Sequence, residues 1–282
     1  MPGRVRARSA PAASSSFITG NGFAERCRFV LDADGFAVNE EAENENWWFC
    51  KADFLEYFFE ELAPDSEFVL FSHNSDRPID ARFRRHLRRR NLVAWFAANA
   101  ALVHPKLVAC PLGIANPEWP HGDTTAIEAV QRADVAKERL FDVSFTVNTN
   151  RAERERCLAE TGLELEAPRS FAEYLDRLAA SQFCISPRGN GIDTHRTWEA
   201  LYVRTIPVVT RSVLTDHHPD LPLVVLDNWS EFRSIDFGPE LYERTWDDWN
   251  PDKLRLDRYL ERVSRTVDRL RGDDDARPAG PG

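Results

Sequence analysis

Long hydrophobic runs, paired cysteines and an excess of basic residues are all missing from this 282-residue sequence. No apolar stretch approaches the roughly 18 residues that a membrane-spanning helix requires. The five cysteines are widely spaced, odd in number and without a C-x-x-C pair, so they predict neither a zinc ribbon nor a disulfide framework. We therefore expect free thiols in a reducing compartment, and a soluble cytoplasmic protein.

The charge balance and a missing phosphate-loop motif argue against further classes. A formal net charge of −10 is unlike that of a general nucleic-acid binder, which needs a basic face. No G-x-x-x-x-G-K-[ST] stretch occurs, which counts against a phosphate-ester or sulfate-transfer enzyme. With 43% hydrophobic residues, a chain of this length can bury a substantial core in one large or two moderate domains.

Strands that alternate with helical segments predict an α/β fold in two tandem units. We expect an N-terminal α/β domain over residues 17–125, a C-terminal α/β domain over 126–250 and an amphipathic helix over 251–272. The polar ends, 1–16 and 273–282, are expected to be a disordered leader and tail. In such folds ligands bind beyond the carboxyl ends of the strands, and two facing layers make a cleft.

Local signals predict several elements. The Asp32–Gly35 turn is expected to join two short strands. The apolar run 46–63 is interpreted as a helix that ends before a proline. Ser170 and Glu173 have the spacing of a capping box, and Asn250 is expected to cap the last helix.

The most distinctive stretch, residues 184–209, is CISPRGNGIDTHRTWEALYVRTIPVV. It predicts a buried strand, a glycine-rich loop, a helix capped by Asp193 and a second strand. Glycines let the backbone approach a ligand, and the free N–H groups of a helix start suit a phosphate. Arg196 in the first helical turn opposes the helix dipole, and a bound anion would explain it. Arg188 could close on the same anion.

Glu199 follows Arg196 on the same helical face. A nucleoside diphosphate fits this arrangement, with arginines on the phosphates and the carboxylate on the ribose hydroxyls. The alternative is an exposed Arg196–Glu199 pair, which would contribute roughly a few tenths of a kcal/mol.

The same stretch resembles a segment of the exostosin-like glycosyltransferases, which runs as Pro, a Gly-containing loop, Arg, two residues, Glu-Ala-Leu and then Ile-Pro-Val-Val. The resemblance extends over roughly residues 138–235, where FDVSFTVNTNRAERERCL is similar to the opening strand and helix of the family's C-terminal half. The N-terminal half resembles the family only in its general α/β layout. Where the family usually has Gly two residues before Ile-Pro, this chain has Arg204. The matching residues are Pro187, Gly189, Arg196, Glu199, Ala200, Leu201, Ile206, Pro207, Val208 and Val209.

The resemblance implies a GT-B-like fold, in which two Rossmann-like layers face each other across a cleft and the C-terminal layer binds the sugar nucleotide. It implies transfer of a sugar from a nucleoside-diphosphate sugar to a glycan hydroxyl held by the N-terminal domain, with inversion and without an essential metal or cofactor. Asn148 and Asn150, which could contact the donor, have turn and helix-cap roles as an alternative. The implied nucleotide-sugar ligands are Asn148, Asn150, Arg151, Arg188, Gly189, Asn190, Asp193, His195, Arg196 and Glu199.

An inverting transfer also needs a general base, most often a carboxylate or histidine. His73 and Asp76 follow a predicted buried strand and are candidates, with a capped turn before Pro78 as the alternative. Asp32 and Asp34 match the D-x-D pattern of metal-dependent GT-A transferases, although Asp-Gly turns are also ordinary hairpin chemistry. A non-catalytic module that binds nucleotide sugars or glycans is a further alternative.

The segment Arg82–Arg90 has six arginines in nine residues, with Phe83 and Leu87 expected to anchor it. It is interpreted as a solvated basic helix, or as a contact for an acidic acceptor or an anionic membrane. Four tryptophans are either core residues or sugar-stacking faces: Trp47, Trp48, Trp95 and Trp119. The oligomeric state stays open.

Overall fold

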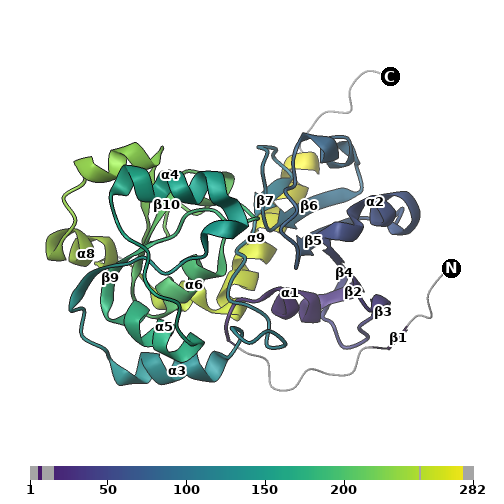
Figure 1. The fold of residues 1–282 in the computed structure, drawn as a ribbon. Coiled ribbons are helices and arrows are strands. Elements are labelled where there is room, and N and C mark those ends of the chain that lie inside the picture. The colour runs from purple at the N-terminus through teal and green to yellow at the C-terminus, as the bar shows by residue number, and fades with distance from the viewer. Residues whose placement is uncertain (1–5, 8–15, 248, 276–282) are drawn as a thin grey trace. The chain divides into compact units, whose positions relative to one another are not determined.

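The computed structural model describes residues 6–7, 16–247 and 249–275. The chain divides into two compact units. Figure 1 labels the helices and strands. Unit 1 comprises the described parts of Met1–Cys110 and Asp252–Gly282, and unit 2 comprises those of Pro111–Pro251. Each unit is a mixed α/β structure built on a largely parallel sheet, so the predicted α/β class in two units is confirmed.

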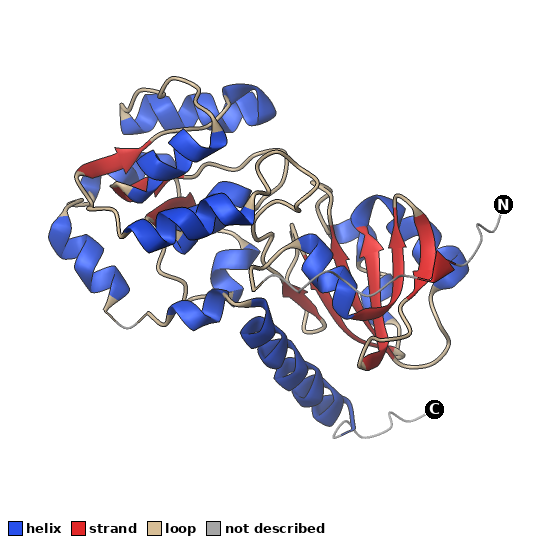
Figure 2. Ribbon diagram, turned by 90° about the horizontal axis from the view of Figure 1, so that it is seen from below, coloured by secondary structure: helices blue, strands red, loops and turns tan. Residues whose placement is uncertain are grey.

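Unit 1 contains a seven-stranded sheet in the described part of the chain, with the order β1-β3-β2-β4-β5-β6-β7. All neighbouring strands are parallel except β2 and β3, which form the predicted hairpin with Asp32 opposite Gly35. Figure 2 shows the larger of these strands side by side. The strands are β1 (Arg6–Ala7), β2 (Cys27–Asp32), β3 (Gly35–Val38), β4 (Asn44–Lys51), β5 (Phe68–His73), β6 (Leu92–Ala97) and β7 (Leu107–Ala109).

The apolar run predicted as one helix is two different elements. Its first part is the strand β4, in which Trp47, Trp48 and Phe49 are buried. Only the part after Lys51 is helical. Aromatic residues favour strands, and β4 lies between β2 and β5, so tertiary pairing decided against the helix. The helical part consists of η1 (Ala52–Phe54), α2 (Leu55–Tyr57) and the π-helical turn η2 (Phe58–Leu62).

The basic segment is also not a regular helix. It forms two 3₁₀ turns, η3 (Ala81–Phe83) and η4 (His86–Arg88). Phe83 and Leu87 are buried, as expected. The helix predicted over residues 251–272 begins later, at Leu256, because the 3₁₀ turn η7 (Pro251–Leu254) precedes it.

Two longer helices complete unit 1. Helix α1 (Gly20–Arg26) is capped by the side chain of Thr19 and packs on β4. Helix α9 (Leu256–Asp275) packs on β6 and buries Leu256, Val263 and Val267, which are part of its predicted apolar stripe. It therefore belongs to unit 1, together with the N-terminal strands. No helix in the described residues is long and apolar enough to cross a membrane.

Unit 2 contains a four-stranded, all-parallel sheet in the described part of the chain, with the order β11-β10-β9-β8. Parallel neighbours need crossover connections, and helices supply them here. The strands are β8 (Arg139–Asp142), β9 (Ser181–Ile185), β10 (Ile206–Thr210) and β11 (Val224–Leu226). The helices and 3₁₀ turns are α3 (Thr124–Ala133), η5 (Val147–Asn150), α4 (Arg151–Thr161), α5 (Phe171–Ala179), α6 (His195–Tyr202), α7 (Val213–His217), η6 (Trp229–Ser234) and α8 (Pro239–Trp246).

Local sequence signals hold well in unit 2. Ser170 and Glu173 make both bonds of the predicted capping box at the start of α5. Gly162 ends α4 in the left-handed conformation, with φ of 74°. The stretch 184–209 folds as expected into β9, a loop, α6 and β10.

The units divide at Cys110–Pro111, whereas the sequence-based boundary lies between residues 125 and 126. Residues 111–125 belong to unit 2, where the backbone N–H of Leu112 donates to Asp193 at 2.8 Å. The expected leader and tail lie mostly outside the described residues, and Arg6–Ala7, inside the expected leader, pairs with β3.

Candidate functional site

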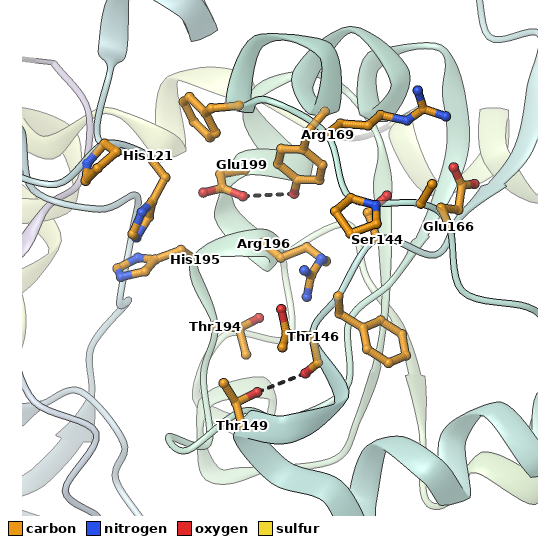
Figure 3. Close-up of a pocket in the computed structure, with 16 residues that line it drawn as sticks. His121, Ser144, Thr146, Thr149, Glu166, Arg169, Thr194, His195, Arg196 and Glu199 are labelled. Atoms are coloured by element: carbon orange, nitrogen blue, oxygen red, sulfur yellow. Dashed lines mark hydrogen bonds between the residues drawn. The ribbon is translucent and has the colours of Figure 1, made fainter.

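A pocket of about 650 Å³ lies in unit 2, beside the loops that follow β8 and β9. Polar and aromatic side chains from both loops, from α5 and from the start of α6 line it (Figure 3). It is therefore at the place that parallel α/β sheets use for ligands. The lining residues are Pro120, His121, Ser144, Phe145, Thr146, Thr149, Glu166, Ala167, Pro168, Arg169, Phe171, Tyr174, Thr194, His195, Arg196 and Glu199.

Arg196 lies near the centre of these residues in Figure 3. Its buried Nε makes no hydrogen bond with the described residues, and its guanidinium makes no ion pair with a described carboxylate within 4.0 Å. The guanidinium carbon lies 5.6 Å from the ring centroid of Phe145. A half-buried guanidinium without such a partner is suited to a bound anion.

A second arginine, Arg154 on α4, lies against the same ring, with its guanidinium carbon 5.5 Å from the centroid. Arg154 is only 5% exposed. Its Nε donates to the backbone oxygen of Arg188 at 3.0 Å, and its Nη1 donates to that of Thr146. Burial, and next the charge of Arg196, lower the pKa of Arg154 to about 10. The sequence analysis missed this residue, which joins the two loops of the site and adds positive charge beside it.

Glu199 lies on α6, one turn after Arg196, and is 5% exposed. Its Oε2 accepts a hydrogen bond from the hydroxyl of Tyr174 at 2.8 Å. Burial raises the pKa of Glu199 to about 7, against the opposing effects of the Tyr174 hydrogen bond and the Arg196 charge. The pair is therefore not the exposed surface pair of the alternative interpretation. Asp142, whose pKa burial also raises, lies close enough to both to couple with them.

Asp193 does not cap α6, contrary to expectation. The helix is preceded by Thr194, whose side chain makes no capping bond, although its hydroxyl lies 3.0 Å from that of Ser186. The Asp193 carboxylate turns inward instead, accepting bonds from the N–H of Leu112 at 2.8 Å and from the indole of Trp198 at 2.7 Å. Burial raises the pKa of Asp193 to about 6. Its contacts identify it as a positioning residue for the start of α6.

His195 lines the pocket, and its Nδ1 lies 2.8 Å from the backbone oxygen of Gly113. Its ring centroid is 6.0 Å from that of His121. His121 was not identified from the sequence, because only the packing of residues 111–122 against the start of α6 brings it there.

Arg188 does not line this pocket. Its Nη2 donates to the backbone oxygen of Arg211 at 2.6 Å. Gly189 is buried and close to Arg154, since a Cβ at this position would lie 3.1 Å from Nη2 of Arg154. Asn190 is exposed.

The three candidates near the start of α4 bind one another or the neighbouring loop. Nη2 of Arg151 donates to Oδ1 of Asn148 at 2.7 Å, and both side chains are exposed. Nδ2 of Asn150 donates to the backbone oxygen of Gly189 at 3.0 Å. Asn150 occupies the N-cap position of α4, although its side chain makes no capping bond. None of the three candidates lines the pocket, whereas Thr149 from the same turn does.

The candidate bases and the D-x-D pair belong to unit 1. His73 is 2% exposed, and its Nδ1 accepts from the N–H of Asn74 at 2.7 Å, whereas Asp76 is exposed. The role of either as a base stays a prediction. Oδ1 of Asp32 accepts from the N–H of Asp34 at 2.9 Å, as in an ordinary turn. The described residues contain no group of three or more side chains placed to hold a metal ion.

No protein-family model and no curated protein matches the chain significantly. Among solved structures, the chain is similar to the crystal structure of AviGT4, a glycosyltransferase involved in avilamycin A biosynthesis. The similarity has a TM-score of 0.31 and 15% sequence identity, over 79% of this chain and 84% of that chain. With a TM-score this low, nothing about function follows for the present chain.

Proposed function

We propose that the protein is a glycosyltransferase that binds a nucleoside-diphosphate sugar in the pocket of unit 2. The sugar is transferred to a hydroxyl of a glycan, with inversion and without an essential metal. The resemblance of residues 138–235 to the exostosin-like family and the chemistry of the pocket support the proposal together.

The observation that carries it is the guanidinium of Arg196. It lies in a pocket of about 650 Å³, large enough for a nucleotide, with its Nε unbonded among the described residues. Arg154 adds a second positive charge next to it. A departing diphosphate would be stabilised here, because charge develops on it as the sugar leaves and the donor groups are already in place.

The other end of the proposed donor is a nucleoside. The carboxyl of Glu199 lies one helical turn from Arg196, a separation that suits ribose hydroxyls next to a diphosphate. Tyr174 and Phe171 contribute aromatic rings beside it, with centroids 6.1 Å apart. Rings of this kind suit the face of a nucleobase.

Unit 1 supplies the acceptor side in this proposal, with His73 or Asp76 as the base. The exposed arginines of the segment Arg82–Arg90 would favour an acidic acceptor. Two arginines of the segment already have partners: the exposed Arg82 pairs with Asp80 at 2.9 Å, and the half-buried Arg89 donates to the backbone oxygen of Phe59 at 2.8 Å. A cytoplasmic location is part of the proposal and is supported by five buried cysteines without a disulfide.

Thermal unfolding against a panel of nucleoside diphosphates and their sugars tests the proposal. A ligand that binds only the folded state raises the melting temperature, and saturation to a hundred times Kd stabilises by about 2.7 kcal/mol. For a nucleotide that raises the melting temperature of the wild type, we expect Arg196→Ala to lower the affinity by roughly tenfold to a hundredfold. Loss of a charge-assisted hydrogen bond has an effect of this size. Arg132→Ala is the matched control, because Arg132 is an exposed arginine of unit 2 outside the pocket.

The outcome that rejects the proposal is the absence of a thermal shift with every nucleotide in the wild-type protein. If nucleotides bind, transfer of a labelled sugar to a glycan panel separates a transferase from a binding module. Activity that is lost in EDTA and restored by a divalent metal would contradict the metal-independent mechanism and favour the Asp32–Asp34 alternative.

A further inference from the structure

The segment Asn116–Gly122 is a tight double turn in unit 2. The N–H of Trp119 donates to the backbone oxygen of Asn116 at 3.0 Å, and the N–H of Gly122 donates to that of Trp119 at 2.8 Å. A Cβ on Gly122 would lie 2.0 Å from the Asn116 oxygen, so only glycine fits there. Pro117 and Pro120 restrict the backbone further. These features restrict the backbone from which the side chains of the turn project.

This turn presents a large aromatic ring to solvent. Trp119 is 58% exposed, whereas Trp95, Trp198 and Trp229 are each 1% exposed or less. Of the four tryptophans considered as sugar-stacking faces, Trp47, Trp48 and Trp95 are thus buried and Trp119 is not. A single exposed ring needs no explanation by itself. Its neighbours provide the reason to assign it a role.

Three aromatic rings lead from this turn into the pocket. The ring centroids of Trp119 and His121 are 6.4 Å apart, and those of His121 and His195 are 6.0 Å apart. Both histidines line the pocket, and His195 immediately precedes Arg196. The row is continuous from an exposed surface to the side chain that faces the proposed diphosphate.

Figure 3 shows His121 and His195 together on one side of Arg196, with Ser144 and Glu166 on the other side. Glu199, the proposed ribose contact, is bonded to Tyr174 and not to either histidine. The nucleoside half of a donor would therefore take the Tyr174 side, which leaves the histidine row for sugar. A row that ends at a solvent-exposed ring suits a ligand that continues out of the pocket.

From this geometry we infer that Trp119, His121 and His195 form a saccharide-binding row for the glycan acceptor of the proposed transferase. Sugar rings offer apolar C–H faces that stack on aromatic rings, and hydroxyls that bond to imidazole nitrogens. The inference rests on the proposed function and adds to it contacts in unit 2 for part of the glycan chain, in addition to the acceptor contacts proposed for unit 1.

The test uses the full chain and an array of immobilised neutral and uronate-containing oligosaccharides. We expect Trp119→Ala to lower the affinity for the best-bound glycan by about tenfold, and Trp119→Phe to retain most of that affinity. Leu140→Ala removes another exposed apolar side chain of unit 2 outside the pocket, and should leave binding unchanged. Nucleotide-induced thermal shifts of the same variants should equal that of the wild type.

Three results overturn the inference. The first is that no oligosaccharide binds the wild type, and the second is that Trp119→Ala binds as tightly as the wild type. The third is that Trp119→Ala loses its nucleotide shift and keeps its glycan binding, which would make the ring a nucleobase platform. Glycan binding that depends on Trp119, in a protein that no nucleotide stabilises, supports the row while rejecting the proposed transferase.

Discussion

The hydroxyl of Tyr174 on α5 donates a hydrogen bond of 2.8 Å to the carboxyl of Glu199 on α6, inside the wall of the pocket. The bond joins two helices of unit 2 and stabilises the ionised form of a carboxyl whose pKa burial raises to about 7. A group that changes charge near neutral pH therefore lies one turn from Arg196. Its protonation will influence what the pocket binds.

Replacing Tyr174 with Phe should raise the pKa of Glu199 above the wild-type value. The hydroxyl lowers this pKa by donating to the carboxylate, and phenylalanine cannot donate. Carbon-13 NMR titration of the glutamate carboxyls measures the shift, and Glu199→Gln assigns the resonance. An unchanged or lower pKa in the Tyr174→Phe variant would show that the hydrogen bond does not form in solution.

Glu199 should also make folding stability depend on pH. Its folded-state pKa of about 7 exceeds the ordinary value of 4.5, so an unfolded chain ionises first. The stability is fully present below pH 4.5 and is lost as the pH rises to about 7, by an amount on the order of 2–3 kcal/mol. Urea unfolding at several pH values should therefore show a smaller decline for Glu199→Gln than for the wild type. Equal slopes for the two proteins would contradict the burial of this charge.

Arg154→Met should destabilise unit 2 by about 2–4 kcal/mol. The variant leaves the backbone oxygens of Thr146 and Arg188 without their buried donor. Lysine should not restore stability, because its single ammonium lacks the fork that reaches both oxygens. Urea denaturation measures the loss, with Arg156→Met, an exposed change on the same helix, as the control. Similar stabilities for the two methionine variants would rule out the bridging role.

These residues also show which parts of the structure the sequence could predict. The capping box of Ser170 and Glu173 was predictable because its bonds span three residues of one segment. Arg154 was not, because the helix around it is mostly charged and only the fold brings the Arg188 oxygen to it. The strand β4 was mistaken for a helix for a related reason. A short, continuously apolar run has no hydrophobic periodicity that distinguishes a strand from a helix, and the strands that pair with it lie elsewhere in the sequence.

The structure brings some of the predicted site residues together in one pocket and leaves others outside it. Arg196 and Glu199 were located by their spacing on one helix, and the structure places both in the pocket. Arg188 and Asp193 are near them in sequence, but their side chains are bonded to Arg211 and Leu112, which no local pattern indicates. Spacing predicts neighbours on one element, and long-range hydrogen bonds decide where loop side chains point.

Asp193→Ala should cost about 2–4 kcal/mol in unfolding free energy, and Asp193→Asn less. Alanine leaves the N–H of Leu112 and the indole N–H of Trp198 without an acceptor in a buried site. Asparagine keeps one oxygen for these two donors and loses the bond from the N–H of Thr194. Thermal unfolding of the three proteins at pH 7 measures the order. Equal losses for alanine and asparagine would mean that the shared acceptor is not what stabilises the segment.

Lys137 should produce a pH dependence of the opposite sign to that of Glu199. Its ammonium donates to the backbone oxygen of Val203 and to Oγ1 of Thr205, both at 2.9 Å. Burial, and next the charge of Arg204, lower its pKa from 10.5 to about 7. Between these values the unfolded chain holds a proton that the folded protein has lost, so the free energy of unfolding rises with pH.

Lys137→Met removes this rise. The free energy of unfolding of the wild type minus that of the variant should therefore increase by on the order of 2–4 kcal/mol from pH 7 to pH 10. The difference is the quantity to measure, because buried thiols such as Cys157, whose pKa burial raises, give both proteins the opposite slope at high pH. Lys51→Met, which breaks an ion pair of 3.1 Å with Asp53, should keep the wild-type dependence in this range. A stability difference that stays constant with pH would mean that Lys137 remains charged in the folded protein.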